Sequence, residues 1–233
     1  MSPEQTRYRR RRKIATWMVF ALVGVALVFG GRLLLLRSPR FTLQAVSVTG
    51  AVDVPAQVIR AASGLRVGVP LLSADLDGAQ TRVAAIPSVA SVEASRHWPG
   101  IVELHVTERT PVALASSPNG LRLVDHTGMA YRQAGAKAPA LPRLAAARVA
   151  PNDPATAAGL AVLASLPMPV RSQLQVVEAS GPRAVTLRLI GGKQVRWGDS
   201  EQSDRKAAVL AVLLSQPASV YDVSSPELPT VRR

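Results

Sequence analysis

The sequence has no cysteine and is poor in acidic and aromatic residues. The absence of cysteine excludes disulfide frameworks, thiolate metal sites and thiol nucleophiles. Its 233 residues include 15 Asp and Glu against 28 Lys and Arg, for a formal net charge of +13, and only 4% are aromatic. Because 48% of the residues are hydrophobic and only 18% are charged, the composition favours folded domains over a disordered tail.

The basic excess is concentrated at the N-terminus. Nine of the Lys and Arg residues lie within residues 1–40, where Glu4 is the only acid. The high isoelectric point is therefore largely a property of this end, and we expect no nucleic acid partner for the rest of the chain.

A long apolar run follows the basic tail. Residues 14–31 carry no charge, and after Arg32 four leucines extend the run to residue 36. As a helix, residues 14–36 reach about 35 Å, enough to cross a hydrocarbon core of about 30 Å. Trp17 and Arg32, near its two ends, are side chains that favour the membrane interface. We predict a transmembrane helix over 14–36, preceded by a basic cytoplasmic tail, 1–13.

The charges that flank this run predict its orientation. More basic residues precede it than follow it, so the positive-inside rule keeps the tail in the cytoplasm and exports the main body, a single-pass type II topology. A cleaved signal peptide and a buried soluble helix are the alternatives. The run exceeds the roughly 7–15 residues of a signal h-region, and no small-residue cleavage site follows it. The basic tail has a rival interpretation as a nucleic-acid patch, but beside a span it is typical of a topology and lipid-headgroup signal.

The first part of the main body, residues 42–110, reads as strand, helix, helix, strand, strand. Val46 and Val48 alternate with polar residues, as in a half-buried strand. Two short helices with one apolar face follow, and a Pro-Gly turn separates the strands 88–98 and 101–109. The pattern predicts an α+β domain.

The second part, residues 111–225, is β-rich with two predicted helices. One helix opens at Asp153, and the other runs over about 204–215. The last predicted strand is 219–225. Two prolines soon after it indicate that this is an edge strand, which the prolines terminate. A C-terminal tail, 226–233, follows.

No motif in the sequence carries catalytic chemistry. His97, His105 and His126 are not paired at metal-ligand spacing, and no nucleophile elbow or phosphate-binding loop is present. Trp98 and Trp197 precede turn residues. The simpler interpretation is that they pack in the core or at its rim, and the more specific one is that they contact cell-wall glycan. We predict no catalytic, cofactor or metal site.

The order and spacing of these segments resemble the FtsQ/DivIB family of bitopic bacterial cell-division proteins. The resemblance is carried by VSVTG (46–50), GVPLLSAD (68–75), IPSVASVEASRHWPGIVELHVTERTPVA (86–113), LVDHTGMAY (123–131), VRWGD (195–199) and YDVSSPELPTVR (221–232). The residues that match the family's motifs in a structural role are Arg96, Trp98, Pro99, Glu108, Arg109, Trp197, Gly198 and Lys206. The DVSSP ending is similar to that of actinobacterial members.

The resemblance implies a POTRA domain over 42–110 and a β domain of the FtsQ/DivIB type over 111–225. It implies a scaffold without enzyme activity, located in the cell membrane at the division septum, that links early and late division proteins. Expected partners are FtsB/DivIC-like and FtsL-like coiled-coil proteins, other divisome membrane proteins and membrane lipid, with a role in controlling septal peptidoglycan synthesis.

The resemblance also implies a partner-binding strand. In the family, a coiled-coil partner pairs with the last strand of the β domain. An edge strand presents unpaired N–H and C=O groups that a partner strand satisfies. Carried over to this sequence, the expected partner-binding residues are Tyr221, Asp222, Val223, Ser224 and Ser225.

Two other functions compete with the scaffold. One is a POTRA-containing component of envelope assembly or transport, although the alternating segments of a membrane β-barrel are absent from the sequence. The other is a membrane-anchored cell-wall hydrolase, which would need a catalytic constellation that the sequence does not show.

Overall fold

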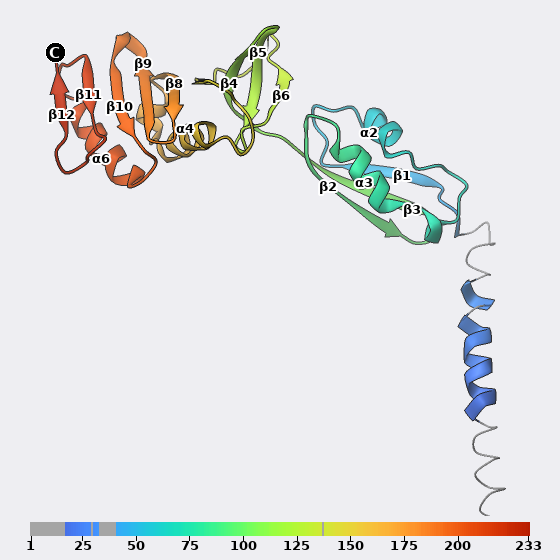
Figure 1. Cartoon of the computed structure of the whole chain (residues 1–233). Helices are drawn as coiled ribbons and strands as arrows, with labels where there is room; N and C mark the ends of the chain where they lie inside the picture. The colour runs from blue at the N-terminus through green and yellow to red at the C-terminus, as the bar shows by residue number, and fades with distance from the viewer. Residues whose placement is uncertain (1–16, 29, 33–40, 137) are drawn as a thin grey trace, which may run out of the picture. The chain divides into compact units, whose positions relative to one another are not determined.

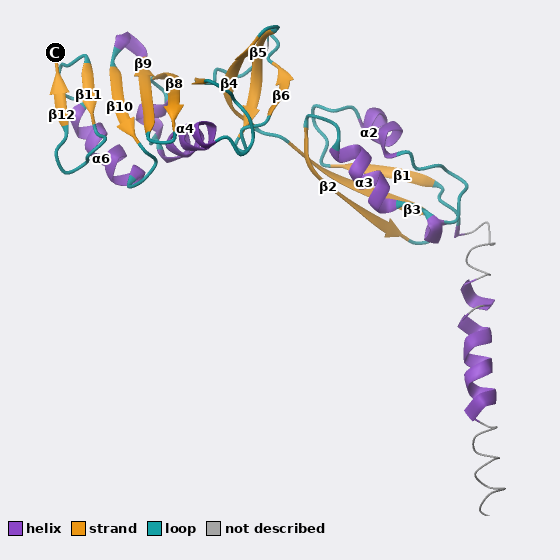
Figure 2. Ribbon diagram, viewed as in Figure 1, coloured by secondary structure: helices purple, strands orange, loops and turns teal. Residues whose placement is uncertain are grey.

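The computed structural model describes residues 17–28, 30–32, 41–136 and 138–233, and the chain divides into two compact units between Glu108 and Arg109 (Figures 1 and 2). Residues 17–28 and 30–32 are helical, with exposed apolar side chains. Within the described part of the chain, no helix has both the length and the apolar character that crossing a bilayer requires. The predicted span over 14–36 lies partly outside the described residues.

The first unit contains a three-stranded sheet with two helices on one face (Figure 2). Its elements are β1 (Ala45–Thr49), α2 (Ala56–Ser63), the 3-10 turn η2 (Leu71–Ser73), α3 (Leu76–Ala84), β2 (Val89–His97) and β3 (Ile101–Glu108). The strand order is β1-β3-β2, with β1 parallel and β2 antiparallel to β3. The predicted α+β order of strand, helix, helix, strand, strand is confirmed.

Alternation along β3 builds the core of this unit. Val102, Leu104 and Val106 are at most 1% exposed and pack beneath the helices, as the period of two predicts. Glu103 and His105 lie on the opposite, polar face of the strand. Helix α3 begins where the carboxylate of Asp75 accepts a hydrogen bond from the N–H of Gly78, an N-cap.

The second unit contains a nine-stranded mixed sheet. Its strands are β4 (Pro111–Ser117), β5 (Gly120–Asp125), β6 (Ala130–Gln133), β7 (Arg143–Ala146), β8 (Leu174–Gly181), β9 (Ala184–Leu189), β10 (Gln194–Gly198), β11 (Val220–Asp222) and β12 (Thr230–Arg232). Its helical elements are α4 (Pro154–Ser165), α5 (Met168–Arg171), the 3-10 turn η3 (Ile190–Gly192) and α6 (Ser203–Leu213). The strand order is β12-β11-β10-β9-β8-β7-β4-β5-β6. The β-rich domain is confirmed, and the short helix α5 adds to the two predicted helices.

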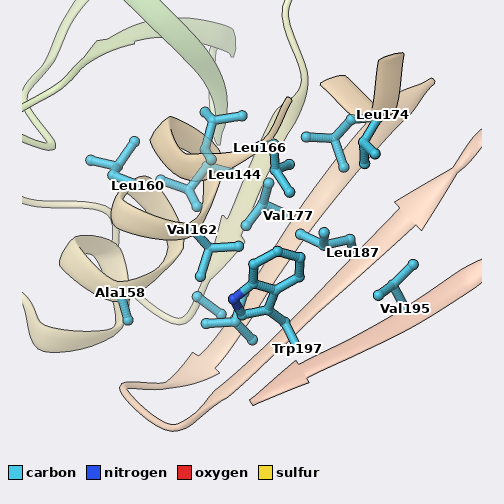
Figure 3. Close-up of a cluster of buried hydrophobic side chains, with 14 of the residues drawn as sticks. Leu144, Ala158, Leu160, Val162, Leu166, Leu174, Val177, Leu187, Val195 and Trp197 are labelled. Atoms are coloured by element: carbon cyan, nitrogen blue, oxygen red, sulfur yellow. The ribbon is translucent and has the colours of Figure 1, made fainter. Parts of the chain in front are cut away.

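Helices α4 and α6 cover one face of this sheet (Figure 1). Figure 3 shows the core that they enclose, where the indole of Trp197 lies among aliphatic side chains from α4 and from β8, β9 and β10. Trp197 and Leu187 are completely buried. This core holds β10 in place, and β10 is the strand against which β11 pairs.

The end of the sheet differs from the prediction. The strand at 219–225 was expected to form its edge, but β11 lies between β10, to which it is parallel, and β12, to which it is antiparallel. That expectation is wrong because the prolines do not stop the sheet. They lie in the loop that returns the chain as β12, where the N–H of Leu228 donates to the carbonyl of Ser225 at 3.0 Å. The residues expected to form a C-terminal tail thus include the edge strand itself.

Candidate partner-binding edge and its supporting residues

Strand β12 forms one open edge of the large sheet. It pairs on one side with β11, in the register Tyr221 to Val231, and no described strand pairs with its other side. All three β12 residues are exposed, and Val231 exposes 40% of its surface. Unpaired backbone groups along such an edge are a template for a further strand.

The hydrogen bonds show which residue of β12 faces the open side. The carbonyl of Arg232 accepts from the N–H of Ser219 at 3.0 Å, so Arg232 directs its backbone groups toward β11. Successive residues of a strand turn these groups to alternate sides. The N–H and C=O of Val231 therefore point outward, where a partner strand would meet them.

The predicted partner-binding residues lie one strand further in. Tyr221 and Val223 are completely buried, and the Tyr221 hydroxyl donates to the carbonyl of Gln216 at 2.9 Å. The carboxylate of Asp222 accepts from the N–H of Ser224 at 3.0 Å and from its hydroxyl at 2.6 Å, which fixes the turn that leads to Ser225. These residues shape the hairpin that carries β12, and their own role in partner binding stays a prediction.

A salt bridge ties the hairpin loop to the helix beneath it. The guanidinium of Arg205, on α6, donates to the carboxylate of Glu227 at 2.9 Å. Gly198, with φ of +81°, lies where an added Cβ would be 3.1 Å from the Cβ of Ser224. The loop therefore closes tightly over the end of β10.

Two further motif residues hold α6 against the end of β10. The indole N–H of Trp197 donates to the hydroxyl of Ser203 at 3.2 Å. The ammonium of Lys206, only 2% exposed, donates to the carbonyl of Asp199 at 3.0 Å and to its carboxylate at 2.7 Å. The Lys206 hydrogen bond holds the pKa of Asp199 below its usual value, against an upward effect of burial.

Arg109 anchors the beginning of the second unit. Its guanidinium donates to the buried carboxylate of Asp125 at 2.6 Å, and the Tyr131 hydroxyl donates to the Arg109 carbonyl at 3.2 Å. Burial raises the pKa of Asp125, but hydrogen bonds from Thr127, Arg109 and the N–H of Met129 outweigh it and keep the pKa below its usual value. This cluster supports the fold far along the strand order from β12.

The other motif residues lie in the first unit and also have structural contacts. The Glu108 carboxylate accepts from the consecutive N–H groups of Val52, Asp53 and Val54 at 2.9–3.1 Å. Arg96 donates to two carbonyls of the η2 region, those of Leu71 at 3.1 Å and Ala74 at 2.8 Å.

Trp98 and Pro99 form the turn between β2 and β3. Their peptide bond is cis. Trp98 is 51% exposed, so it is a rim residue, whereas Trp197 belongs to the core.

The motif residues thus divide among three places. Trp197, Gly198 and Lys206 lie around the β10–β11 region with the predicted partner-binding segment. Arg109 lies in the same unit but at the other end of the sheet, beside β5. The remaining four, Arg96, Trp98, Pro99 and Glu108, belong to the first unit. Sequence reasoning missed β12 and the acids that pair with Arg109 and Lys206. The sequence does indicate β12 by the alternation Thr-Val-Arg after the second proline. This indication is weak because it extends over only three residues.

The two units define a class of protein: a POTRA domain followed by the β domain of bacterial division proteins. Residues 41–109 match the family model of the FtsQ-type POTRA domain. Residues 112–225 match the model of the C-terminal domain of cell division protein FtsQ/DivIB. The chain belongs to the FtsQ/DivIB family of cell-division proteins.

Curated relatives agree with this assignment. The chain is 40% identical to the cell division protein FtsQ of Mycolicibacterium smegmatis over 223 residues, covering 96% of this chain and 66% of the relative. It is 37% identical to FtsQ of Mycobacterium leprae, covering 92% of this chain and 62% of the relative. FtsQ of Streptomyces venezuelae is 32% identical over 96% of this chain and 87% of its own length. The chain thus spans slightly less than two thirds of the first two relatives.

Proposed function

We propose that the chain is a membrane-anchored, non-enzymatic scaffold of the cell-division machinery. Family membership supports a role in division. The apolar run over 14–36, with basic residues before it, supports a single-pass type II anchor with both folded units outside the cytoplasm. In this proposal the protein lies at the septum, links early and late division proteins, and helps control septal peptidoglycan synthesis.

The proposed binding reaction is strand addition at β12. The observation that carries it is the open side of β12, where Val231 directs an N–H and a C=O outward. A β-strand of an FtsB/DivIC-like partner, with an FtsL-like protein bound to that partner, would complete the ladder. Segment 221–225 contributes by holding β12 on β11. Main-chain bonds would supply affinity, and the exposed side chains of β12 would supply specificity.

The substitution Val231→Pro tests strand addition directly. Proline removes the outward N–H of Val231 but no N–H that faces β11. We expect the full-length protein in lipid nanodiscs to bind the extracytoplasmic part of the host's FtsB/DivIC-type protein at least about tenfold more weakly, because one hydrogen bond and the edge geometry are lost. Titration calorimetry measures the dissociation constant.

Val231→Thr is the matched control because it keeps the N–H and the β-branched shape. Its dissociation constant is expected to stay within about twofold of the unmodified protein. Equal affinities for the proline and threonine variants would refute strand addition at β12. An unchanged near-ultraviolet circular dichroism spectrum confirms that the domain of each variant is folded.

The cellular role has its own test. Depletion of the protein in its native host is expected to give filamentous or swollen undivided cells, with a fluorescent fusion forming a band at midcell. Normal division with a diffuse envelope signal would contradict the scaffold function and favour a general envelope role.

A further inference from the structure

We propose that the end of the POTRA domain around Trp98 lies on the surface of the membrane. This inference rests on the proposed membrane anchor and adds to it a second, peripheral contact with lipid. That contact would restrain the orientation of the domain, whereas a single helix leaves it free to rotate.

The turn that carries Trp98 is fixed to the start of the domain. The carbonyl of Gly100 accepts from the N–H of Gln44 at 2.7 Å, and a Cβ at Gly100 would lie only 2.6 Å from the carbonyl oxygen of Thr42. The rings of Phe41 and Trp98 meet edge to face, with centroids 5.6 Å apart. Trp98 is therefore held beside the residues through which the chain enters the domain.

Other apolar side chains are exposed at the same end. The loop before η2 packs on the chain entry, where the N–H of Leu43 donates to the carbonyl of Val69 at 2.8 Å. Figure 1 shows η2 and the β2–β3 turn at the end of the domain where β1 begins. The exposed apolar residues of these segments are Val67 (66%), Leu72 (37%), Trp98 (51%) and Ile101 (40%).

Chain length keeps this end close to the bilayer. The predicted span ends at residue 36, and Phe41 follows five positions later. Even fully extended, that distance is at most about 18 Å. The headgroup region on one side of a bilayer is itself about 5–8 Å thick. An exposed Trp so near the membrane has a lower free energy in the membrane interface than in water. There its ring contacts acyl chains and its N–H bonds to water and headgroups.

The charges at this end are compatible with a lipid surface. Arg66 is exposed on the loop before η2. Two of the neighbouring acids contact basic side chains: Asp75 pairs with Arg82 at 3.4 Å, and the Glu103 carboxylate lies 2.9 Å from the His97 ring nitrogen. Cations near anionic headgroups favour the bound state.

The absence of cysteine from the sequence allows a sharp test, because one introduced cysteine is the only site for a nitroxide label. Val67→Cys places the label at the proposed lipid-facing end. Val52→Cys, at another exposed valine, places it at the opposite end of the strands, beside Glu108. The full-length protein in nanodiscs with anionic lipid is compared by electron paramagnetic resonance, using oxygen and a water-soluble nickel complex as collision partners.

We expect the ratio of oxygen to nickel accessibility to be at least about threefold higher at residue 67 than at residue 52. Trp98→Ser, combined with Val67→Cys, should lower the ratio toward the value at residue 52, while Trp98→Phe should keep part of it. The far-ultraviolet circular dichroism spectrum serves as the fold control.

Equal accessibility ratios at residues 67 and 52 would overturn the proposal. It would also be overturned if the label at residue 67 were shielded from the nickel complex only after another protein is added. Flotation with liposomes separates this failure from failure of the anchor. A full-length chain that does not float contradicts the membrane anchor, whereas a chain that floats with both labels in water contradicts only the Trp98 contact.

Discussion

At the residue scale, the ion pair between Lys206 and Asp199 is asymmetric. The lysine side chain is 2% exposed, but the carboxylate is 25% exposed and also lies 4.0 Å from Arg183. A charge that loses its partner inside a protein keeps its desolvation cost, whereas one that reaches water does not. Loss of the Asp199 carboxylate should therefore destabilise the fold more than loss of the Lys206 ammonium.

This asymmetry predicts different costs for removing each partner. Asp199→Ala leaves the buried ammonium with only a backbone carbonyl as acceptor, and we expect it to lower the free energy of unfolding by about 3–5 kcal/mol. Lys206→Met fills the same space with an apolar chain and leaves a carboxylate that water can solvate, so its cost is expected to be smaller. Urea denaturation measures both, followed by the emission of Trp197 in a background where Trp17 and Trp98 are replaced by phenylalanine. A larger loss for Lys206→Met would contradict this explanation.

At the element scale, the prediction and the structure differ where a short strand pairs, or a side chain forms an ion pair, with a residue distant in the sequence. Strand β3 is eight residues long, and its alternation alone identified Val102, Leu104 and Val106 as core. Strand β12 has only three residues, and it forms because its backbone pairs with that of β11. A pattern in the sequence cannot show that pairing. Lys206 was singled out by its motif, but its partner Asp199 lies seven positions away, and the fold brings the two side chains together.

Truncations distinguish the roles of β11 and β12. Removing residues 226–233 deletes β12 but leaves Tyr221 and Val223 packed against β10, so we expect the domain to stay folded, with partner binding lost. Removing residues 219–233 also strips both buried side chains from the core, at a cost of about 3–6 kcal/mol from burial alone. Thermal unfolding monitored by near-ultraviolet circular dichroism compares the two. Similar midpoints for both truncations would show that β11 contributes little to the core.

At the scale of the whole molecule, the described residues form two hydrophobic cores that share no residue. The smaller core contains Leu104 beneath the POTRA helices, and the larger contains Leu187 beneath α4 and α6. Both leucines are completely buried. The stability of each unit should therefore depend first on its own core.

Matched substitutions in the two cores test this separation. Leu104→Ala and Leu187→Ala each remove the same atoms from a fully buried site, which typically costs about 2–5 kcal/mol. For a unit of the size of the POTRA domain, each 1 kcal/mol lowers the midpoint of unfolding by about 4–8 °C, and the shift per kcal/mol is smaller for the larger β domain. We expect Leu104→Ala to shift the POTRA transition more than that of the β domain, and Leu187→Ala to do the reverse. Calorimetry of the full-length protein resolves the transitions. The emission of buried Trp197, recorded in a background where Trp17 and Trp98 are replaced by phenylalanine, marks the β domain. Equal shifts of both transitions by either substitution would mean that the two units unfold as one.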